Sequence, residues 1–486
     1  MTELLNDAFN PDSFRSSGHK LVDLLADYLD STKNGNSGLP VLPFSTPEKL
    51  LEYWEREINN RDGSPDDLFK KVLNNSIHIH SPKYMGHQVS PALPLAGLAE
   101  LLSAFLNNSL AVYEMGSPGI AMERIIIKIL AGAIGLGNKA DGVLTSGGTI
   151  GNLTALLAAR QSKSKNNVWK MGTTDGNAPV FLVPEESHYS VERAVRIMGL
   201  GDEGIIKVPV NKKHKLDVKT VERIFTEAAG EGRNIISLVA NACSTSLGLF
   251  DPLEELAGFC KEKNIWFHVD AAHGGPAVFS EKYKHLVSGL EKADSVVIDF
   301  HKMLLHPSLI TAVLFRDEDD SYITFSQKAQ YLWESRGDKD WYNPGKRTLE
   351  CTKNAMSLKV FFTLSNYGTK LFDDNVTVLF NLGRRFAELI KERKNFNLAV
   401  EPESNIVCFR YAPDSTGGKS LNLLNKKIRQ AVIENGDFFI VQTEVNGDTY
   451  FRTCLMNPFT TENELFGLLD KIEITGDSFV SDQPEK

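Results

Sequence analysis

The sequence predicts an α/β fold with a large, doubly wound, mostly parallel sheet domain, a smaller C-terminal α/β domain and a helical N-terminal segment. Strand-like and helix-like stretches alternate over residues 94–362, which is the pattern of a parallel sheet with crossover helices. Beyond residue 365 the pattern changes to a long helix, short strands and a hairpin. Before residue 94 a proline-rich linker joins helical stretches. We therefore expect three domains, residues 1–93, 94–365 and 366–486.

The N-terminal part begins with an amphipathic helix over residues 12–31, because its apolar residues recur at helical spacing. A linker over residues 34–47 follows, whose glycines and prolines favour extended chain. A second helix starts at Thr46-Pro47, since proline suits the first turn of a helix. These helices have little core of their own, so they must pack on another surface.

The C-terminal part is predicted to contain a helix over residues 370–393, strands at 398–400 and 406–411, and a helix from about Leu421. A hairpin over residues 438–455 turns at Asn446-Gly447, because Asn-Gly between alternating apolar residues is a strong hairpin signal. We expect this smaller domain to close on the larger one, with the functional site at their junction.

Composition excludes several classes of protein. The chain has 486 residues and a net charge of −9, with a pI near 5.8, which disfavours nucleic acid and anionic membranes as partners. We expect a cytoplasmic protein, because neither a secretory leader nor a membrane span stands out. The five cysteines are scattered and lack Cys-x-x-Cys spacing, which predicts neither a disulfide framework nor a metal site.

Charged residues follow two of the predicted buried strands. Asp270 ends the run that begins at Ile265, and Lys302 follows the run that begins at Ser295. The carboxyl ends of parallel strands meet at the crevice where open α/β sheets bind ligands. A pyridoxal phosphate (PLP) enzyme needs both groups, a lysine for the cofactor aldehyde and a carboxylate for the pyridine nitrogen. Taken singly, such a lysine is usually a solvated loop residue and such an aspartate a helix cap.

A second motif predicts a phosphate site. Residues 141–149 pass from a short strand through Gly147-Gly148-Thr149 into a helix. The N–H groups at a helix start bind phosphate, and paired glycines let the backbone come close. Paired glycines before a helix also occur in ordinary tight turns that bind no phosphate. The segment lacks the Gly-Lys-Ser/Thr of a nucleotide-binding P-loop and the spaced glycines of a dinucleotide site.

The strings at residues 268–275 and 299–302 resemble those of the group II PLP-dependent amino-acid decarboxylases, which have fold type I. The resemblance extends from about residue 39 to about residue 464. It implies decarboxylation of an L-amino acid to the amine and CO₂ by a homodimer with shared active sites. It also implies a Schiff base on Lys302, Asp270 at the pyridine nitrogen, and phosphate bound by Gly148 and Thr149.

Four further residues match cofactor-binding positions of that family. His188, in a Ser-His-x-Ser string, would stack on the pyridine ring as a catalytic residue. Thr245 would pack beside a cofactor oxygen, Ala272 would lie under the ring, and His301 would contact the phosphate. Without the resemblance, His188 would be interpreted as a cap or solvated residue and Thr245 as a turn hydroxyl.

Substrate residues are predicted at two places. Arg452 matches the family arginine that binds the substrate α-carboxylate, and His87, Gln88 and Asn108 occupy segments that line the side-chain pocket in relatives. Their polarity favours a small polar or acidic side chain. Glutamate, cysteine sulfinate, aspartate, diaminobutyrate and aromatic amino acids stay open as substrates, because no basic residue stands out as the partner of a second carboxylate.

Residues 317–348 form a long polar stretch that we interpret as a functional lid rather than core. In relatives a loop tyrosine that reaches the partner's site protonates the product, and Tyr331 and Tyr342 are the candidates. Two rival functions are another reaction of the same cofactor, such as aldehyde-forming oxidative decarboxylation-deamination, and a scaffold without activity. The intact Asp270 and Lys302 pair disfavours the scaffold.

Overall fold

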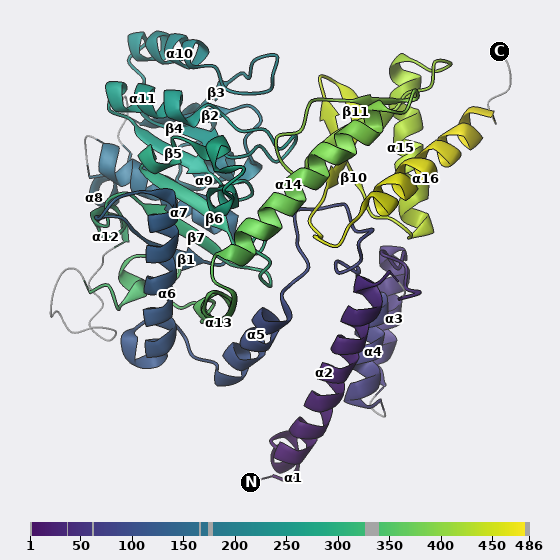
Figure 1. Cartoon of the computed structure of the whole chain (residues 1–486). Helices are drawn as coiled ribbons and strands as arrows, with labels where there is room; N and C mark the ends of the chain where they lie inside the picture. Colours follow the sequence, from purple (N-terminus) through teal and green to yellow (C-terminus); the bar gives the residue numbers. More distant parts are fainter. Residues whose placement is uncertain are drawn as a thin grey trace. The chain divides into compact units, whose positions relative to one another are not determined.

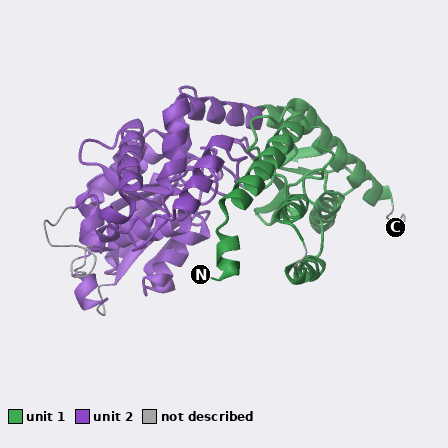
Figure 2. Cartoon of the chain, turned by 90° about the horizontal axis from the view of Figure 1, so that it is seen from below, with its two compact units in different colours: residues 1–87, 385–399, 408–486 green, residues 88–384, 400–407 purple. Residues whose placement is uncertain are grey.

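The computed structural model describes residues 2–35, 37–60, 63–164, 167–173, 178–325 and 340–481 (Figure 1). The chain divides into two compact units (Figure 2). Unit 1 comprises Met1–His87, Arg385–Ala399 and Cys408–Lys486, and unit 2 comprises Gln88–Arg384 and Val400–Val407. The N-terminal helices and the C-terminal sheet therefore belong to one unit. The three folding domains proposed from the sequence stay a prediction.

Unit 2 contains a seven-stranded sheet of order β1-β7-β6-β5-β4-β2-β3. Six strands run in the same direction, and β7 runs antiparallel to both of its neighbours, β1 and β6. This confirms the predicted large, mostly parallel sheet. The strands are β1 (Asp141–Thr145), β2 (Pro179–Pro184), β3 (Ile205–Val208), β4 (Asn234–Asn241), β5 (Trp266–Asp270), β6 (Ser295–Asp299) and β7 (Thr311–Phe315).

Burial explains why these runs form a central sheet. Every residue of β1, β2, β5, β6 and β7 is buried, as expected for strands covered on both faces. Helix α7 (Gly148–Lys163) packs across β4, β5, β6 and β7, while α10 (Val218–Gly230) and α11 (Leu253–Lys263) pack against β4. The parallel register places the ends of β4, β5 and β6, namely Asn241, Asp270 and Asp299, at one edge of the sheet.

Unit 2 contains further helices. They are α5 (Pro94–Leu106), α6 (Tyr113–Ile134), α8 (Val168–Met171), α9 (Tyr189–Ile197), α12 (Asp319–Phe325) and α13 (Ser357–Tyr367). Helix α13 packs against α5 and α6, and α9 packs against α7. No helix within the described ranges combines the length and the apolar character needed to cross a bilayer.

Residues 400–407 belong to unit 2 although the chain on either side of them belongs to unit 1. Glu403 accepts hydrogen bonds from Lys215 Nζ at 2.6 Å and from the backbone N–H of Phe250 at 3.0 Å. Asn405 Oδ1 lies 2.8 Å from His273 Nε2. Through these contacts residues 400–407 supply polar partners to the rest of unit 2.

Unit 1 contains an antiparallel sheet of order β10-β11-β9-β8, formed by β8 (Phe396–Leu398), β9 (Ile406–Tyr411), β10 (Val441–Val445) and β11 (Asp448–Cys454). Part of β9 lies in unit 2. The predicted hairpin is confirmed, because Asn446 and Gly447 both adopt the positive φ angles that a tight turn requires. The strand predicted at residues 398–400 is instead β8, since buried Phe396 pairs with Tyr411.

Two helices of unit 1 start within one residue of the positions that the sequence predicts. Helices α2 (Pro11–Lys33), α3 (Pro47–Asn59) and α4 (Pro65–Asn75) each begin with proline after a polar capping residue, namely Asn10, Thr46 and Ser64. Each capping side chain accepts a hydrogen bond from a first-turn N–H, and proline has no N–H to satisfy there. The other helices are α1 (Glu3–Ala8), α15 (Gly418–Asn435) and α16 (Glu462–Ser481), and α14 (Lys370–Lys391) contributes to both units.

The interpretation of residues 317–348 as a lid without core residues is wrong for the parts that the structure describes. Helix α12 packs on α7, and its Tyr322 and Phe325 are buried one turn apart. Arg347 is also buried, and its guanidinium group pairs with Asp141 Oδ2 on β1 at 2.8 Å. The prediction overlooked this pair, which joins residues far apart in the chain. Residues 326–339 lie outside the described residues.

Candidate functional site

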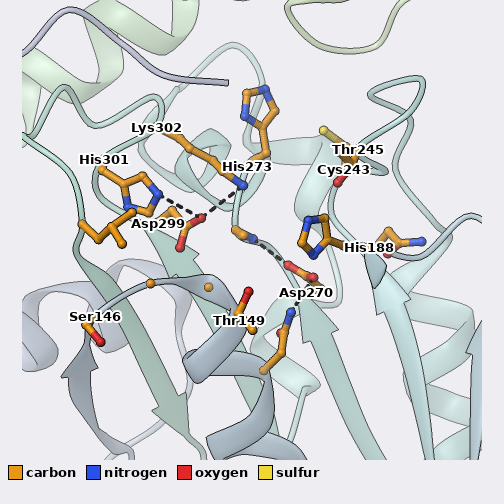
Figure 3. Close-up of a pocket in the computed structure, with 16 residues that line it drawn as sticks. Ser146, Thr149, His188, Cys243, Thr245, Asp270, His273, Asp299, His301 and Lys302 are labelled. Atoms are coloured by element: carbon orange, nitrogen blue, oxygen red, sulfur yellow. Dashed lines mark hydrogen bonds and ion pairs between the residues drawn. The ribbon is translucent and has the colours of Figure 1, made fainter. Parts of the chain in front are cut away.

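A cavity of about 330 Å³ lies in unit 2 at the edge where β4, β5 and β6 end (Figure 3). It brings together all eight residues that the sequence assigns to the cofactor. They are Gly148, Thr149, His188, Thr245, Asp270, Ala272, His301 and Lys302. The predicted convergence of Asp270 and Lys302 thus appears in the fold, because β5 and β6 are adjacent and parallel.

One wall of the cavity is the start of helix α7. Gly147 has a φ of +125°, which favours glycine, and α7 begins without a side-chain cap. A Cβ atom on Gly148 would lie only 3.3 Å from both carboxylate oxygens of Asp299. A side chain at position 148 would therefore press on Asp299, so glycine suits this close approach, and the uncapped first turn leaves N–H groups for an anion. This geometry suits a phosphate.

Asp270 is held by a hydrogen-bond network under the cavity. Its Oδ1 accepts a bond from the backbone N–H of Ala272 at 3.2 Å, and its Oδ2 accepts one from Asn152 Nδ2 at 2.9 Å. Asn152 Oδ1 lies 3.0 Å from Nε2 of His268, whose Nδ1 lies 2.8 Å from Ser295 Oγ. Asp270 is 7% exposed, so these bonds offset the cost of burying its charge.

His188 forms the opposite wall, at the N-cap of α9. Its Nδ1 lies 2.7 Å from Ser190 Oγ, and Ser190 Oγ also accepts a hydrogen bond from Asn152 at 2.9 Å. Burial lowers the pKa of His188 from 6.5, partly opposed by the negative charge of Asp270, so the ring is neutral at pH 7. A neutral, oriented imidazole of this kind can stack on an aromatic cofactor.

Lys302 reaches the cavity from the turn after β6. Its Nζ lies 3.1 Å from Asp299 Oδ2, and His301 Nε2 lies 3.7 Å from the same oxygen (Figure 3). His301 Nδ1 lies 3.0 Å from the backbone oxygen of Ile310. A lysine amine in a cavity of this size can form a covalent bond with an aldehyde.

The predicted substrate residues do not line this cavity. Gln88 and Asn108 belong to unit 2, where Asn108 Nδ2 donates to the backbone oxygen of Leu106 at 3.2 Å. His87 and Arg452 belong to unit 1, and Arg452 lies on β11. Burial and the positive charges of Arg452 and Arg429 lower the pKa of His87, which shows that the three groups are neighbours. The sequence prediction overlooked Arg429, which lies on α15.

The structure describes only one of the two candidate proton donors. Tyr331 lies outside the described residues. Tyr342 is half-buried, and its ring lies 5.9 Å from the ring of Tyr113 and packs against a core cluster that includes Leu110. Tyr342 is not among the residues that line the cavity within the chain.

Several cavity residues were overlooked in the sequence, among them Asn152, Asn241, Cys243, His273 and Asp299. For one of these residues, Asn152, the sequence contains a pattern that could have identified it. Asn152 stands one turn after Gly148 on α7 and is followed at helical spacing by the apolar residues Ala155, Leu156 and Ala159. His268, beneath the cavity, alternates with Asp270 along β5 and therefore points to the same face of the sheet.

The profile of the pyridoxal-dependent decarboxylase conserved domain matches residues 47–412. An aromatic-L-amino-acid decarboxylase of Bacillus atrophaeus is 26% identical over 474 residues, which cover 96% of each chain. The acidic amino acid decarboxylase GADL1 of Mus musculus is 28% identical over 453 residues, 90% of this chain and 82% of the relative. The crystal structure of the glutamate decarboxylase domain of diaminobutyrate-pyruvate transaminase and L-2,4-diaminobutyrate decarboxylase from Vibrio parahaemolyticus superposes with a TM-score of 0.83, at 25% identity and 96% coverage of each chain.

Proposed function

Because this chain belongs to the pyridoxal-dependent decarboxylase family, we propose that it removes CO₂ from an L-amino acid with a small polar or acidic side chain. Family membership makes the protein a carboxy-lyase that uses PLP. The proposal concerns the substrate and the residues that act on it.

The cavity of unit 2 fits PLP. The cofactor supplies an electron sink when bound. In the proposed arrangement, Gly148 and Thr149 hold its phosphate at the start of α7, and Lys302 Nζ binds its aldehyde carbon. Asp270 faces the pyridine nitrogen, and its ionised form is stabilised there because a protonated pyridine carries the opposite charge. His188 stacks on the ring, held by Ser190 at 2.7 Å. Thr245, Ala272 and His301 complete the proposed cofactor contacts.

The observation that favours an acidic substrate is the cationic group in unit 1. Arg452 and Arg429 both lie close enough to His87 to lower the pKa of its imidazole. Guanidinium groups bind carboxylates with two parallel hydrogen bonds, so two arginines suit a substrate that carries two carboxylates. We assign the α-carboxylate to Arg452 and the side-chain carboxylate to Arg429, with His87, Gln88 and Asn108 as further polar contacts. Two positive charges disfavour a diamine such as diaminobutyrate, and the relatives include an acidic amino acid decarboxylase.

A homodimer with shared active sites completes the proposal. Helix α5 exposes an apolar surface that a monomer would leave in water, formed by Leu98, Leu101, Leu102, Phe105 and Leu106. An apolar cluster on one helix is typical of a subunit interface. A loop tyrosine, Tyr331 or Tyr342, protonates the product in this scheme.

The deciding experiment is a CO₂-release assay over the common L-amino acids and 2,4-diaminobutyrate, with amine and aldehyde products both measured. We expect aspartate, glutamate or cysteine sulfinate to give the highest kcat/KM, with the amine as product. Arg429→Met should raise KM for that substrate by about tenfold or more, because it removes one charged hydrogen-bond partner. Lys426→Met, which removes an exposed charge from the same helix, should leave KM unchanged. A preference for aromatic amino acids or diaminobutyrate would contradict the substrate assignment, and an aldehyde product would contradict the reaction.

A further inference from the structure

A carboxylate outside the cavity joins the two turns that carry His188 and Thr245. Glu186 lies in the turn between β2 and α9, two residues before His188. Its Oε2 accepts a hydrogen bond from Ser246 Oγ at 3.3 Å, and Ser246 directly follows Thr245 in the turn after β4. His188 and Thr245 line the cavity, whereas Glu186 and Ser246 do not (Figure 3). Glu186 therefore links two turns of the cavity wall without entering the cavity.

A third side chain holds the other oxygen of this carboxylate. His214 Nδ1 lies 2.5 Å from Glu186 Oε1. The side chain of His214 is 11% exposed and that of Glu186 is 18% exposed, so water competes weakly for this contact. Both carboxylate oxygens are thus bonded, which fixes the side chain of Glu186 at two points. We call Ser246, Glu186 and His214 the carboxylate bridge.

The backbone of His214 adopts a conformation that favours glycine. Its φ angle is +56°, in the left-handed region that is unfavourable for a residue with a Cβ atom. Asn211 holds this conformation, because its backbone oxygen accepts from the N–H of His214 at 2.8 Å and its Oδ1 accepts from the N–H of Lys213 at 2.8 Å. Glycine would adopt the same angle without strain. A histidine held in such a conformation indicates a role for its imidazole.

The loop between β3 and α10, which carries His214, is fastened to unit 2 by other contacts as well. Glu185 accepts a hydrogen bond from a backbone N–H of this loop at 2.9 Å, and Lys215 Nζ lies 2.6 Å from Glu403 Oε1. The contact between His214 and Glu186 is therefore not needed to hold the loop. Its effect falls on Glu186 instead.

We propose that Glu186 is a positioning residue for the cofactor and that His214 holds it in place. In the proposed arrangement the pyridine ring contacts His188 at its face and Thr245 beside an oxygen. Both contacts require the two turns to stay at a fixed separation, which the carboxylate bridge sets. This inference rests on the proposed cofactor contacts of His188 and Thr245.

Three variants test the carboxylate bridge. Glu186→Ala removes the carboxylate, and His214→Gly removes the imidazole at a position whose backbone angle suits glycine, so the fold is retained. Glu186→Gln is the conservative variant, because its amide oxygen can accept from Ser246 and its amide nitrogen can donate to His214. Glu203→Ala is the control, since the side chain of Glu203 is 94% exposed in the same unit.

The first measurement is amide hydrogen exchange in the cofactor-free protein. We expect Glu186→Ala to raise the exchange rates of peptides that cover residues 185–188 and 243–248 by about fivefold or more, because hydrogen bonds that hold both turns are lost. His214→Gly should raise the same rates to a smaller extent. Glu186→Gln and Glu203→Ala should match wild type.

The second measurement is the visible circular dichroism of bound PLP, which depends on how firmly the protein orients the ring. We expect Glu186→Ala and His214→Gly to bind PLP with a weaker dichroism band, and kcat to fall by about tenfold or more. KM for the amino acid should stay unchanged, because the residues proposed to bind the substrate lie elsewhere. Glu186→Gln should restore the band and kcat, and Glu203→Ala should leave both unchanged. His188→Ala and Thr245→Ala are the references, because they remove the ring contacts themselves.

An unchanged dichroism band in Glu186→Ala, whatever its exchange rates, would overturn the proposal. A loss in Glu186→Gln as large as that in Glu186→Ala would also overturn it, because the amide can make both hydrogen bonds. If His188→Ala and Thr245→Ala left the band unchanged as well, the proposed ring contacts would be wrong, and the proposal would fall with them.

Discussion

Asn152 Nδ2 donates a hydrogen bond to Asp270 Oδ2 over 2.9 Å, and the same amide nitrogen donates to Ser190 Oγ over 2.9 Å. The orientation of the amide is fixed, because an ionised carboxylate can only accept. Asn152 Oδ1 must then accept from Nε2 of His268, and the other ring nitrogen of His268 accepts from Ser295. Ser190 in turn donates to Nδ1 of His188. One amide therefore orients both proposed contacts of the pyridine ring.

We predict that Asn152→Ala weakens PLP binding and lowers kcat by about tenfold or more, because Asp270 and Ser190 both lose a donor in a buried place. The affinity can be followed by the visible absorbance of the bound cofactor. Asn366→Ala, which removes an exposed amide from α13, is the control and should bind PLP normally. An unchanged affinity in Asn152→Ala would mean that Asp270 is oriented by Ala272 alone.

We predict that Lys302→Ala abolishes turnover and the absorbance of covalently bound PLP, although PLP still binds through its phosphate. Asp270→Ala should lose nearly all activity, whereas Asp270→Glu should keep a measurable part, because the pyridine nitrogen needs a negative partner. Steady-state assays and equilibrium dialysis check both. Equal activity in the two Asp270 variants, or substantial turnover without Lys302, would remove these residues from the mechanism.

Acid should destabilise the protein through His268. Burial lowers the pKa of His268 from 6.5 to about 4. The unfolded chain therefore takes up a proton at a higher pH than the folded chain, and stability falls as the pH falls. The loss is about 1.4 kcal/mol per pH unit between about 6.5 and about 4. Thermal unfolding of cofactor-free protein across this range should show a shallower decline for His268→Gln than for wild type. Exposed His285→Gln should follow the wild-type decline.

The loop tyrosines can be distinguished by mixed dimers. We predict that Tyr331→Phe slows product formation by roughly 10²–10⁴-fold, the usual value of general-acid catalysis, and that Tyr342→Phe has the smaller effect. If the loop acts on the neighbouring subunit, heterodimers of Tyr331→Phe and Lys302→Ala chains should regain activity, because one site is then intact. The reverse order of effects would assign the role to Tyr342. Normal rates in both variants would exclude a tyrosine donor.

A buried ion pair should contribute strongly to the stability of unit 2. Lys353 Nζ lies 2.6 Å from Glu123 Oε1 and donates to the backbone oxygen of Leu144 at 2.7 Å. Lys353→Met should lower the free energy of unfolding by about 3–5 kcal/mol, because it leaves the carboxylate buried without its cation. The double variant Lys353→Met/Glu123→Leu should recover most of that loss in urea unfolding. Additive losses would show that the two side chains act independently.

The sequence identifies the features that depend on local chemistry. The capping residue and proline at Thr46-Pro47 locate a helix start, and Asn446-Gly447 locates a hairpin. Asp270 and Lys302 are found because each follows a recognisable buried strand. The hydrogen bond of Asn152 to Asp270 cannot be found by such reasoning, since the two residues lie 118 positions apart. The proximity of Asp299 to Thr311 depends on the antiparallel register of β6 and β7, which apolar runs alone do not reveal.

The path of residues 400–407 restricts how this protein can be divided or recombined. A fragment that ends at Arg384 would contain every residue that lines the cavity, yet it would lack Glu403 and Asn405. Lys215 would then lose its carboxylate, and His273 would lose its amide partner in the cavity wall. The proposed cofactor site therefore depends on contacts from a later segment of the chain. Exchange of the C-terminal part between relatives preserves the site only if the segment that enters unit 2 is retained.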